Sequence, residues 1–254
     1  MSVRTARVQR PRTAVALGAA LAAVVLVGGC ASAGSDDEPE RRSFPLQGRT
    51  LTVDSDDSAL DVVAADEEQV RVTRWFDGRT VLGESPEATW RMDGDTLQLR
   101  VKCDGFVSDC SARHRIEVPR DAGVHVVNKD GRVTADGFRT AVRIRSDDGR
   151  VTVKDSSGPL ELISADGAVE ALGIRSARVD ARSQDGKVRL ALAEVPDRVE
   201  AHSRDGAVSV DLPDGAYKVA ASSDDGSVDV GVDRDDQSAH VVEAHSEDGS
   251  VSVN

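Results

Sequence analysis

The chain has 254 residues, of which 39% are hydrophobic and only 3% aromatic, and its formal net charge is -13. Residues 1–29 contain four arginines and no acidic residue, so the remainder carries -17. A surface this negative repels nucleic acid and anionic lipid. We therefore expect no nucleic-acid partner.

The first 29 residues have the pattern of a secretory signal peptide. Four arginines, at positions 4, 7, 10 and 12, precede an apolar stretch at 14–27 that is short for a membrane span. The stretch ends in "LVGGC", which resembles a bacterial lipobox. This predicts that Cys30 is lipidated, becomes the mature N-terminus and holds the protein on the extracytoplasmic face of the cell membrane. The alternative is an ordinary cleaved signal with an unmodified Cys30.

Residues 30–43 comprise the lipidated cysteine and a polar segment, "ASAGSDDEPERRS", without hydrophobic periodicity. Such a composition predicts a flexible tether. The rest of the chain, 44–254, is expected to form one β domain, irregular over 44–120 and regular over 121–254.

The irregular part contains several segments that alternate apolar and polar residues, as half-buried strands do. They include "LTVDSDDSALDVVA", in which Ser58 takes the place of a turn glycine, "VRVTRWFDG", "TWRMDGDTLQLRVKC" and "HRIEVP". The aromatic residues of this region permit two interpretations: they plug the open end of a core, or they form a platform for a ligand such as a glycan. These residues are Trp75, Phe76, Trp90 and Phe106.

Two cysteines remain once Cys30 is assigned to the anchor. An even remainder in an exported protein indicates a disulfide, here between Cys103 and Cys110. A metal site that adds His114 to these cysteines is the alternative, but it lacks a fourth ligand at a usual zinc spacing.

A phrase close to Ser-x-Asp-Gly-x-Val recurs seven times, with its glycines 18, 18, 19, 20, 20 and 23 residues apart. Apolar residues stand two and four positions before the Ser and two and four positions after the Gly. Each repeat is therefore predicted to be two short strands joined by a tight turn. We expect the glycine to supply a positive φ, and the Asp to bond the backbone just beyond it. The turn-forming pairs are Asp130-Gly131, Asp148-Gly149, Asp166-Gly167, Asp185-Gly186, Asp205-Gly206, Asp225-Gly226 and Asp248-Gly249.

A period near 20 residues is typical of repeats that stack on one another. The sequence predicts an all-β fold, a parallel β-solenoid with coils of about 20 residues and like residues stacked about 4.8 Å apart. An antiparallel β meander is the alternative, because a two-residue Asp-Gly hairpin also places the Ser and the following Val on one face.

The lipobox, the "GDTLQLRVKC" segment, the "IEVP" before the repeats and the recurring phrase together resemble a bacterial family of adhesin-like proteins with β-strand repeats, a domain of unknown function. The resemblance covers roughly residues 44–254. It implies a right-handed β-helical fold and a lipoprotein signal. The word adhesin implies an analogy only, since fold does not determine function.

Candidate chemistry is sparse. Acidic residues cluster at turns, where backbone geometry accounts for them, and none of the five histidines falls in a triad-like or metal-helix motif. His202 and His245 share one register of the repeat. A stacked Asp column could attract calcium, but the nonapeptide calcium signature is absent. We also expect Arg132, Arg150, Lys187 and Arg204 to offset part of the charge.

We accordingly expect no catalytic residues, no cofactor and no metal. The predicted function is a non-enzymatic scaffold or adhesin-like module that contacts an envelope component or another cell. The alternatives are a carbohydrate-active β-helical enzyme and a calcium-binding surface protein.

Overall fold

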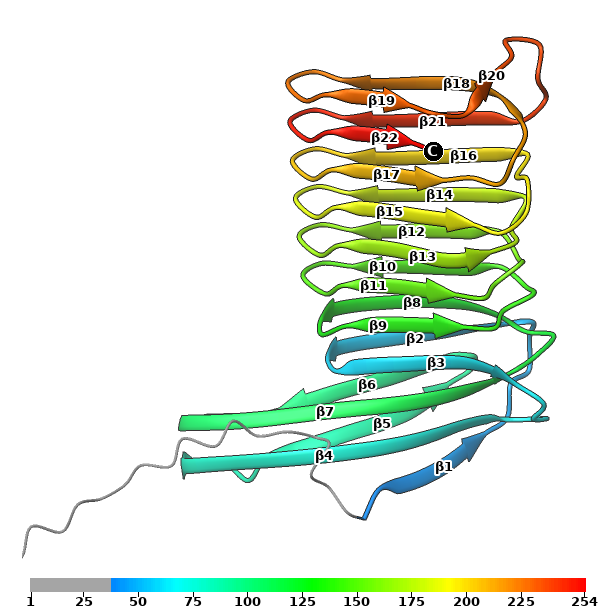
Figure 1. Ribbon diagram of the computed structural model, residues 1–254. Coiled ribbons are helices and arrows are strands. Elements are labelled where there is room, and N and C mark those ends of the chain that lie inside the picture. The colour runs from blue at the N-terminus through cyan, green and yellow to red at the C-terminus, as the bar shows by residue number, and fades with distance from the viewer. Residues whose placement is uncertain (1–37) are drawn as a thin grey trace, which may run out of the picture. The chain divides into compact units, whose positions relative to one another are not determined.

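The computed structural model describes residues 38–254, which form two β-sheets of eleven strands each (Figure 1). We call them sheet A and sheet B. In stacking order, sheet A contains β1 (Glu40–Phe44), β4 (Val70–Gly83), β7 (Gly105–Pro119), β3 (Ala59–Ala65), β9 (Val133–Asp136), β11 (Val151–Lys154), β13 (Val169–Ile174), β15 (Val188–Leu192), β17 (Val208–Asp211), β22 (Val251–Val253) and β19 (Val228–Val230). Sheet B contains β20 (Asp233–Arg234), β18 (Ala216–Ser223), β21 (Val241–Ser246), β16 (Arg198–Ser203), β14 (Arg178–Ser183), β12 (Leu160–Ser164), β10 (Val142–Ser146), β8 (Gly123–Asp130), β2 (Thr50–Asp57), β6 (Thr96–Lys102) and β5 (Glu87–Asp93).

Each repeat contributes one strand to sheet B, turns at its Asp-Gly corner and contributes the next strand to sheet A. Strands of stacked repeats are parallel and in register, so that Ile144 lies beside Leu162, and Val151 beside Val169. The parallel β-solenoid is confirmed, and the antiparallel meander is wrong for the repeats. Within 38–254 no helix is long and apolar enough to cross a membrane.

The core lies between the two sheets and is built from the apolar positions that flank each corner. Their side chains point inward because successive residues of a strand face opposite sides of a sheet. The valines that follow the corner glycines by two positions are almost completely buried in all but one repeat. In the exception, β19, Val228 is 42% exposed.

The stacking order departs from the chain order at both ends of the solenoid (Figure 1). The last strands, β21 and β22, lie between the β16/β17 layer and the β18/β19 layer, which precede them in the sequence. The layer of β2 and β3 likewise lies between β6/β7 and β8/β9. The β21/β22 layer and the β2/β3 layer, which we call the inserted terminal layers because they contain strands near the two ends of the chain, are therefore hydrogen-bonded to a neighbouring layer on both sides.

The irregular part closes the opposite end from β18/β19. Strands β4 and β5 run antiparallel to β7 and β6, and β1 runs antiparallel to β4. Trp90 is 6% exposed and packs edge-on against Phe44, with ring centroids 6.5 Å apart. The plug interpretation thus holds for Trp90, but it is wrong for Phe106, which is 86% exposed.

The paired ends of β4 and β7 extend past the body as a two-stranded arm, residues 76–83 and 105–112 (Figure 1). Phe106 lies at its tip, as does Val81, another exposed apolar residue. The predicted signal peptide and Cys30 fall outside the described residues.

Candidate functional site

In six of the seven repeats a buried or half-buried serine holds the corner together, and Asn128 takes its place in the first. In the corner of Gly206, the buried Ser203 hydroxyl accepts a hydrogen bond from the Gly206 N–H at 3.0 Å. The same hydroxyl donates to the carbonyl oxygen of Gly186, one layer away, at 2.9 Å. Equivalent pairs of bonds are made by Ser164, Ser183, Ser223 and Ser246. The serines thus link neighbouring layers through a continuous ladder, which we call the serine ladder.

The corner glycines are required for a different reason from the one predicted. Of the seven, Gly131 alone has a positive φ, 92°. At the other six, an added Cβ would lie closer than 3.0 Å to the carbonyl oxygen of the glycine in the adjacent layer, a separation that Cβ atoms essentially never show. Close stacking of backbone on backbone therefore excludes a side chain. The expected bond, which a glycine N–H donates to the Asp carboxylate before it, is made by Gly131 to Asp130 at 2.5 Å, whereas at the other corners the glycine N–H donates to a Ser hydroxyl.

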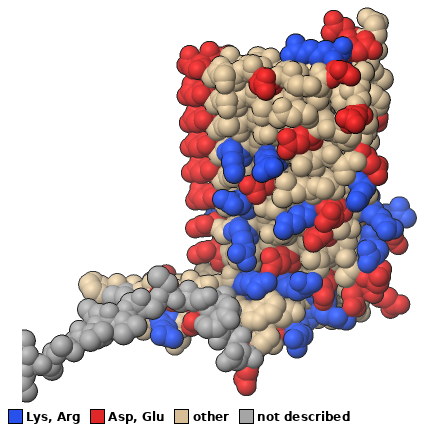
Figure 2. Space-filling model, viewed as in Figure 1, with Lys and Arg blue, Asp and Glu red and all other residues tan. Residues whose placement is uncertain are grey.

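The corner aspartates line one edge of the solenoid, which Figure 2 shows as a column of acidic side chains. The pKa of Asp148 is raised above its usual value by partial desolvation and by the charges of Asp166 and Asp130. Of the four basic residues expected to offset this column, Arg204 does so, bonding Asp185 at 2.6 Å and Asp205 at 3.3 Å. Lys187 instead pairs with Glu170. Within residues 38–254, no three His, Cys, Asp or Glu side chains are placed to hold a metal ion.

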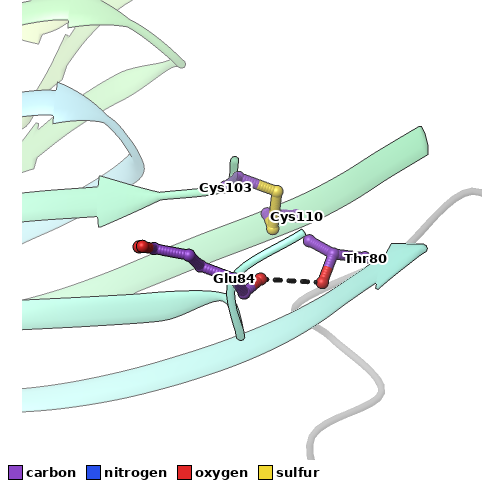
Figure 3. The surroundings of a disulfide bond; sticks show 4 residues. All are labelled: Thr80, Glu84, Cys103 and Cys110. Atoms are coloured by element: carbon purple, nitrogen blue, oxygen red, sulfur yellow. Dashed lines mark hydrogen bonds between the residues drawn. A yellow bond between two sulfur atoms is a disulfide. The ribbon is translucent and has the colours of Figure 1, made fainter. Parts of the chain in front are cut away.

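The disulfide joins Cys103, in the connection between β6 and β7, to Cys110 in the arm part of β7, with the Cα atoms 6.1 Å apart (Figure 3). Close by, the Thr80 hydroxyl donates to the carbonyl oxygen of Glu84 at 2.9 Å. The predicted disulfide is confirmed.

The alternative metal site is wrong because His114 lies in the core, 1% exposed and beside Trp90. Neither ring nitrogen of His114 has a hydrogen-bond partner among the described residues. Burial and the nearby charge of Arg74 lower its pKa to about 3.

A groove of about 480 Å³ lies on the outer face of sheet B beside the corners. Its walls are the outward-facing residues on either side of the buried serines. One column consists of Arg145, Ile163, Arg182, His202 and His245, which lie in register on β10, β12, β14, β16 and β21. The second column consists of Asp147, Ala165, Gln184, Arg204 and Glu247. We call this surface the sheet B groove.

Several polar side chains of the sheet B groove interact with neighbouring side chains. Arg182 contacts Asp180 at 2.9 Å and Glu200 at 3.2 Å. The rings of His202 and His245 have centroids 6.3 Å apart, and His245 Nδ1 is hydrogen-bonded to the Ser222 hydroxyl at 2.9 Å. Desolvation, followed by the charge of Arg182, lowers the pKa of His202.

The shared register of the two histidines could be deduced from the repeat, but the groove could not. The groove depends on which outward-facing residues have short side chains, and on the parallel stacking that brings five segments distant in the sequence together. In the middle of the groove, Ile163 and Ala165 stand among longer side chains, and we call the space above these two residues the hollow. No single segment of the sequence carries that signal.

The two-sheet parallel solenoid and its serine ladder define the described part of the chain as a β-repeat domain. The chain belongs to the Toastrack DUF4097 family, which matches residues 120–254 and is a domain of unknown function. The predicted resemblance is thereby confirmed.

Among curated proteins, none matches the chain significantly. Among solved structures, it is similar to a protein from Clostridium sporogenes described provisionally as a cell adhesion protein, with 10% sequence identity and a TM-score of 0.37. That match covers 85% of this chain and 98% of the other.

Proposed function

We propose that the protein is a non-enzymatic, adhesin-like binding scaffold, anchored to the extracytoplasmic face of the cell membrane by a lipid on Cys30. One observation carries the proposal: the repeated serines and glycines are engaged in the architecture. The serines hold the corners, and the glycines allow the layers to stack. The residues left to make contacts with a partner are those of the outer sheet faces, which form long, regular surfaces suited to an extended partner.

The anchor is supported by the "LVGGC" segment and by the acyl modification that a lipobox implies. One acyl chain binds a bilayer only marginally, and stable attachment needs two or more, as a lipoprotein carries. The link to the bilayer is the polar sequence that precedes β1, shorter than the expected tether because residues 40–43 belong to that strand and pair with β4.

The anchor is tested by expressing the full-length protein and its Cys30→Ser variant in the same bacterial host. Wild type is expected in the membrane fraction with its acyl chains detected by mass spectrometry, and the variant is expected to lose the acyl chains and leave that fraction. The matched control is the double variant Cys103→Ser, Cys110→Ser, which removes the other two cysteines and should stay with the membrane. Unchanged sedimentation and no acylation of wild type would contradict the proposal.

The binding role is tested on intact cells. Cells that display the wild-type protein are treated with a membrane-impermeant crosslinker, and the protein is recovered with whatever it contacts. We expect envelope material or a neighbouring cell's surface component to be captured with wild type and not with cells that lack the protein. Recovery of the bare protein from cells with an intact anchor would refute a binding scaffold.

A further inference from the structure

The sheet B groove has the dimensions of a binding site for a linear polymer. It crosses β10, β12, β14, β16 and β21, so at about 4.8 Å per strand it runs about 19 Å along the solenoid axis. Its volume of about 480 Å³ lies within the usual range of ligand sites. A ligand that follows the groove would meet a similar pair of outward side chains at every layer.

The charges that line the groove exclude strongly charged ligands. Three arginines repel a polycation: Arg145, Arg182 and Arg204. A polyanion meets Asp147 and Glu247 in the groove itself, and the column of corner aspartates runs alongside. A ligand of either sign would therefore place part of its charge against like charge.

The same groups suit hydroxyls, which both donate and accept hydrogen bonds. The arginines and the Gln184 amide donate, and the carboxylates of Asp147 and Glu247 accept. An imidazole such as that of His202 can do either according to its tautomer. Ion pairs and hydrogen bonds already hold Arg182, Arg204 and His245, so little side-chain freedom is lost when a ligand binds.

The middle of the groove offers an apolar contact. Ile163 and Ala165 are half-buried there, and their short side chains leave a hollow between Arg145 and Arg182. The C–H face of a sugar ring can cover such a surface while its hydroxyls reach the polar walls. We propose that the sheet B groove binds an uncharged, hydroxyl-rich polysaccharide along the solenoid axis. This inference rests on the proposed binding function and names the ligand class.

The test uses full-length protein purified in detergent and polysaccharide extracted from the envelope of the producing cells. Anion exchange separates the polysaccharide into a neutral and an acidic pool, and each is labelled with a fluorophore. Binding is measured by fluorescence anisotropy for wild type, Ala165→Arg and Ala191→Arg. Arg204 occupies the position of Ala165 in another repeat, and Lys154 occupies the position of Ala191 in another. The fold therefore tolerates a long basic side chain at each of the two repeat positions.

We expect wild type and Ala191→Arg, which is altered on the outer face of sheet A, to bind the neutral pool equally. Ala165→Arg fills the hollow and should bind about tenfold more weakly or not at all. Size-exclusion chromatography should show that bound polysaccharide keeps its length, whereas shortening would indicate a carbohydrate-active enzyme and overturn the inference.

Preference for the acidic pool, or equal effects of the two substitutions, would also overturn it. If wild type bound neither pool while intact cells still gave crosslinked partners, the groove assignment would fail and the scaffold would stand. If crosslinking also gave nothing, the proposed binding function itself would fail.

Discussion

Replacing Gly206 with alanine tests why glycine stands at the corners. A Cβ at this position would collide with the carbonyl group of Gly186 and the amide nitrogen of Lys187, all backbone atoms that cannot rotate away. Relief requires the two layers to separate, which stretches the bond from the Ser203 hydroxyl to the Gly186 carbonyl and the bond from the Asp205 N–H to the Gln184 carbonyl. Overpacking of this kind costs about 1–3 kcal/mol, and two weakened hydrogen bonds add about 1 kcal/mol each. The stiffer unfolded chain returns about 0.4–1 kcal/mol.

The unfolding free energy of Gly206→Ala should therefore fall by about 2–4 kcal/mol, and because a domain of this size loses about 2–4 °C per kcal/mol, the melting temperature should fall by about 5–15 °C. The control is Gly94→Ala, in the β5–β6 turn, where φ is 57° and a Cβ would meet nothing within 4 Å. Its cost should be the backbone term alone, about 1 kcal/mol. Thermal melts followed by circular dichroism compare the two. If Gly206→Ala melts as high as Gly94→Ala, stacking is not what excludes a side chain.

Three further predictions concern other parts of the fold. Ser203→Ala leaves the Gly206 N–H and the Gly186 carbonyl unpaired and should lower the urea unfolding free energy by about 2 kcal/mol, whereas a value within experimental error of wild type would show that the serine ladder contributes nothing. His114 has a folded pKa of about 3, so the unfolded chain takes up its proton as the pH falls below 6.5 while the folded chain does not. Stability should decline between pH 7 and pH 4, and His114→Leu should remove that share of the decline in urea titrations. Reduction of the Cys103–Cys110 disulfide should accelerate hydrogen exchange in the arm and leave the repeats unchanged, since it closes a loop within the arm region, and exchange that rises throughout the repeats would contradict this.

The repeats could be predicted from sequence because each carries its own strand pattern and corner. What the local pattern does not determine is the partner of each strand. The dipeptide Asp93-Gly94 joins two antiparallel strands and has a positive φ, whereas Asp205-Gly206 joins strands of opposite sheets and does not. The two dipeptides are identical in sequence, so the cause of the glycine requirement is visible only in the stacked layers.

The sheet B groove and the order of the last layers escaped prediction for a related reason. Ile163 and Ala165 become a hollow only because residues about 20 positions away on either side are longer. The insertion of β21 and β22 beneath β18 and β19 has one local sign, the longest interval between corner glycines, 23 residues. Such an interval fits a longer loop equally well, and only the pairing of strands distinguishes the two.

The inserted terminal layers constrain how a solenoid of this kind can change in length. In an ordinary repeat array, a unit can be added to or lost from either end, because a terminal unit has one neighbour. Here the β2/β3 layer and the β21/β22 layer each have two neighbours, and each outer layer is joined to an inner one by a chain connection that passes over the inserted pair. Duplication or deletion of a repeat should therefore be tolerated among β10 to β15, in the middle of the stack, where the change leaves both inserted layers and the connections that pass over them intact. Natural variation in the length of such proteins would then accumulate at the centre of the molecule, with both ends inherited unchanged.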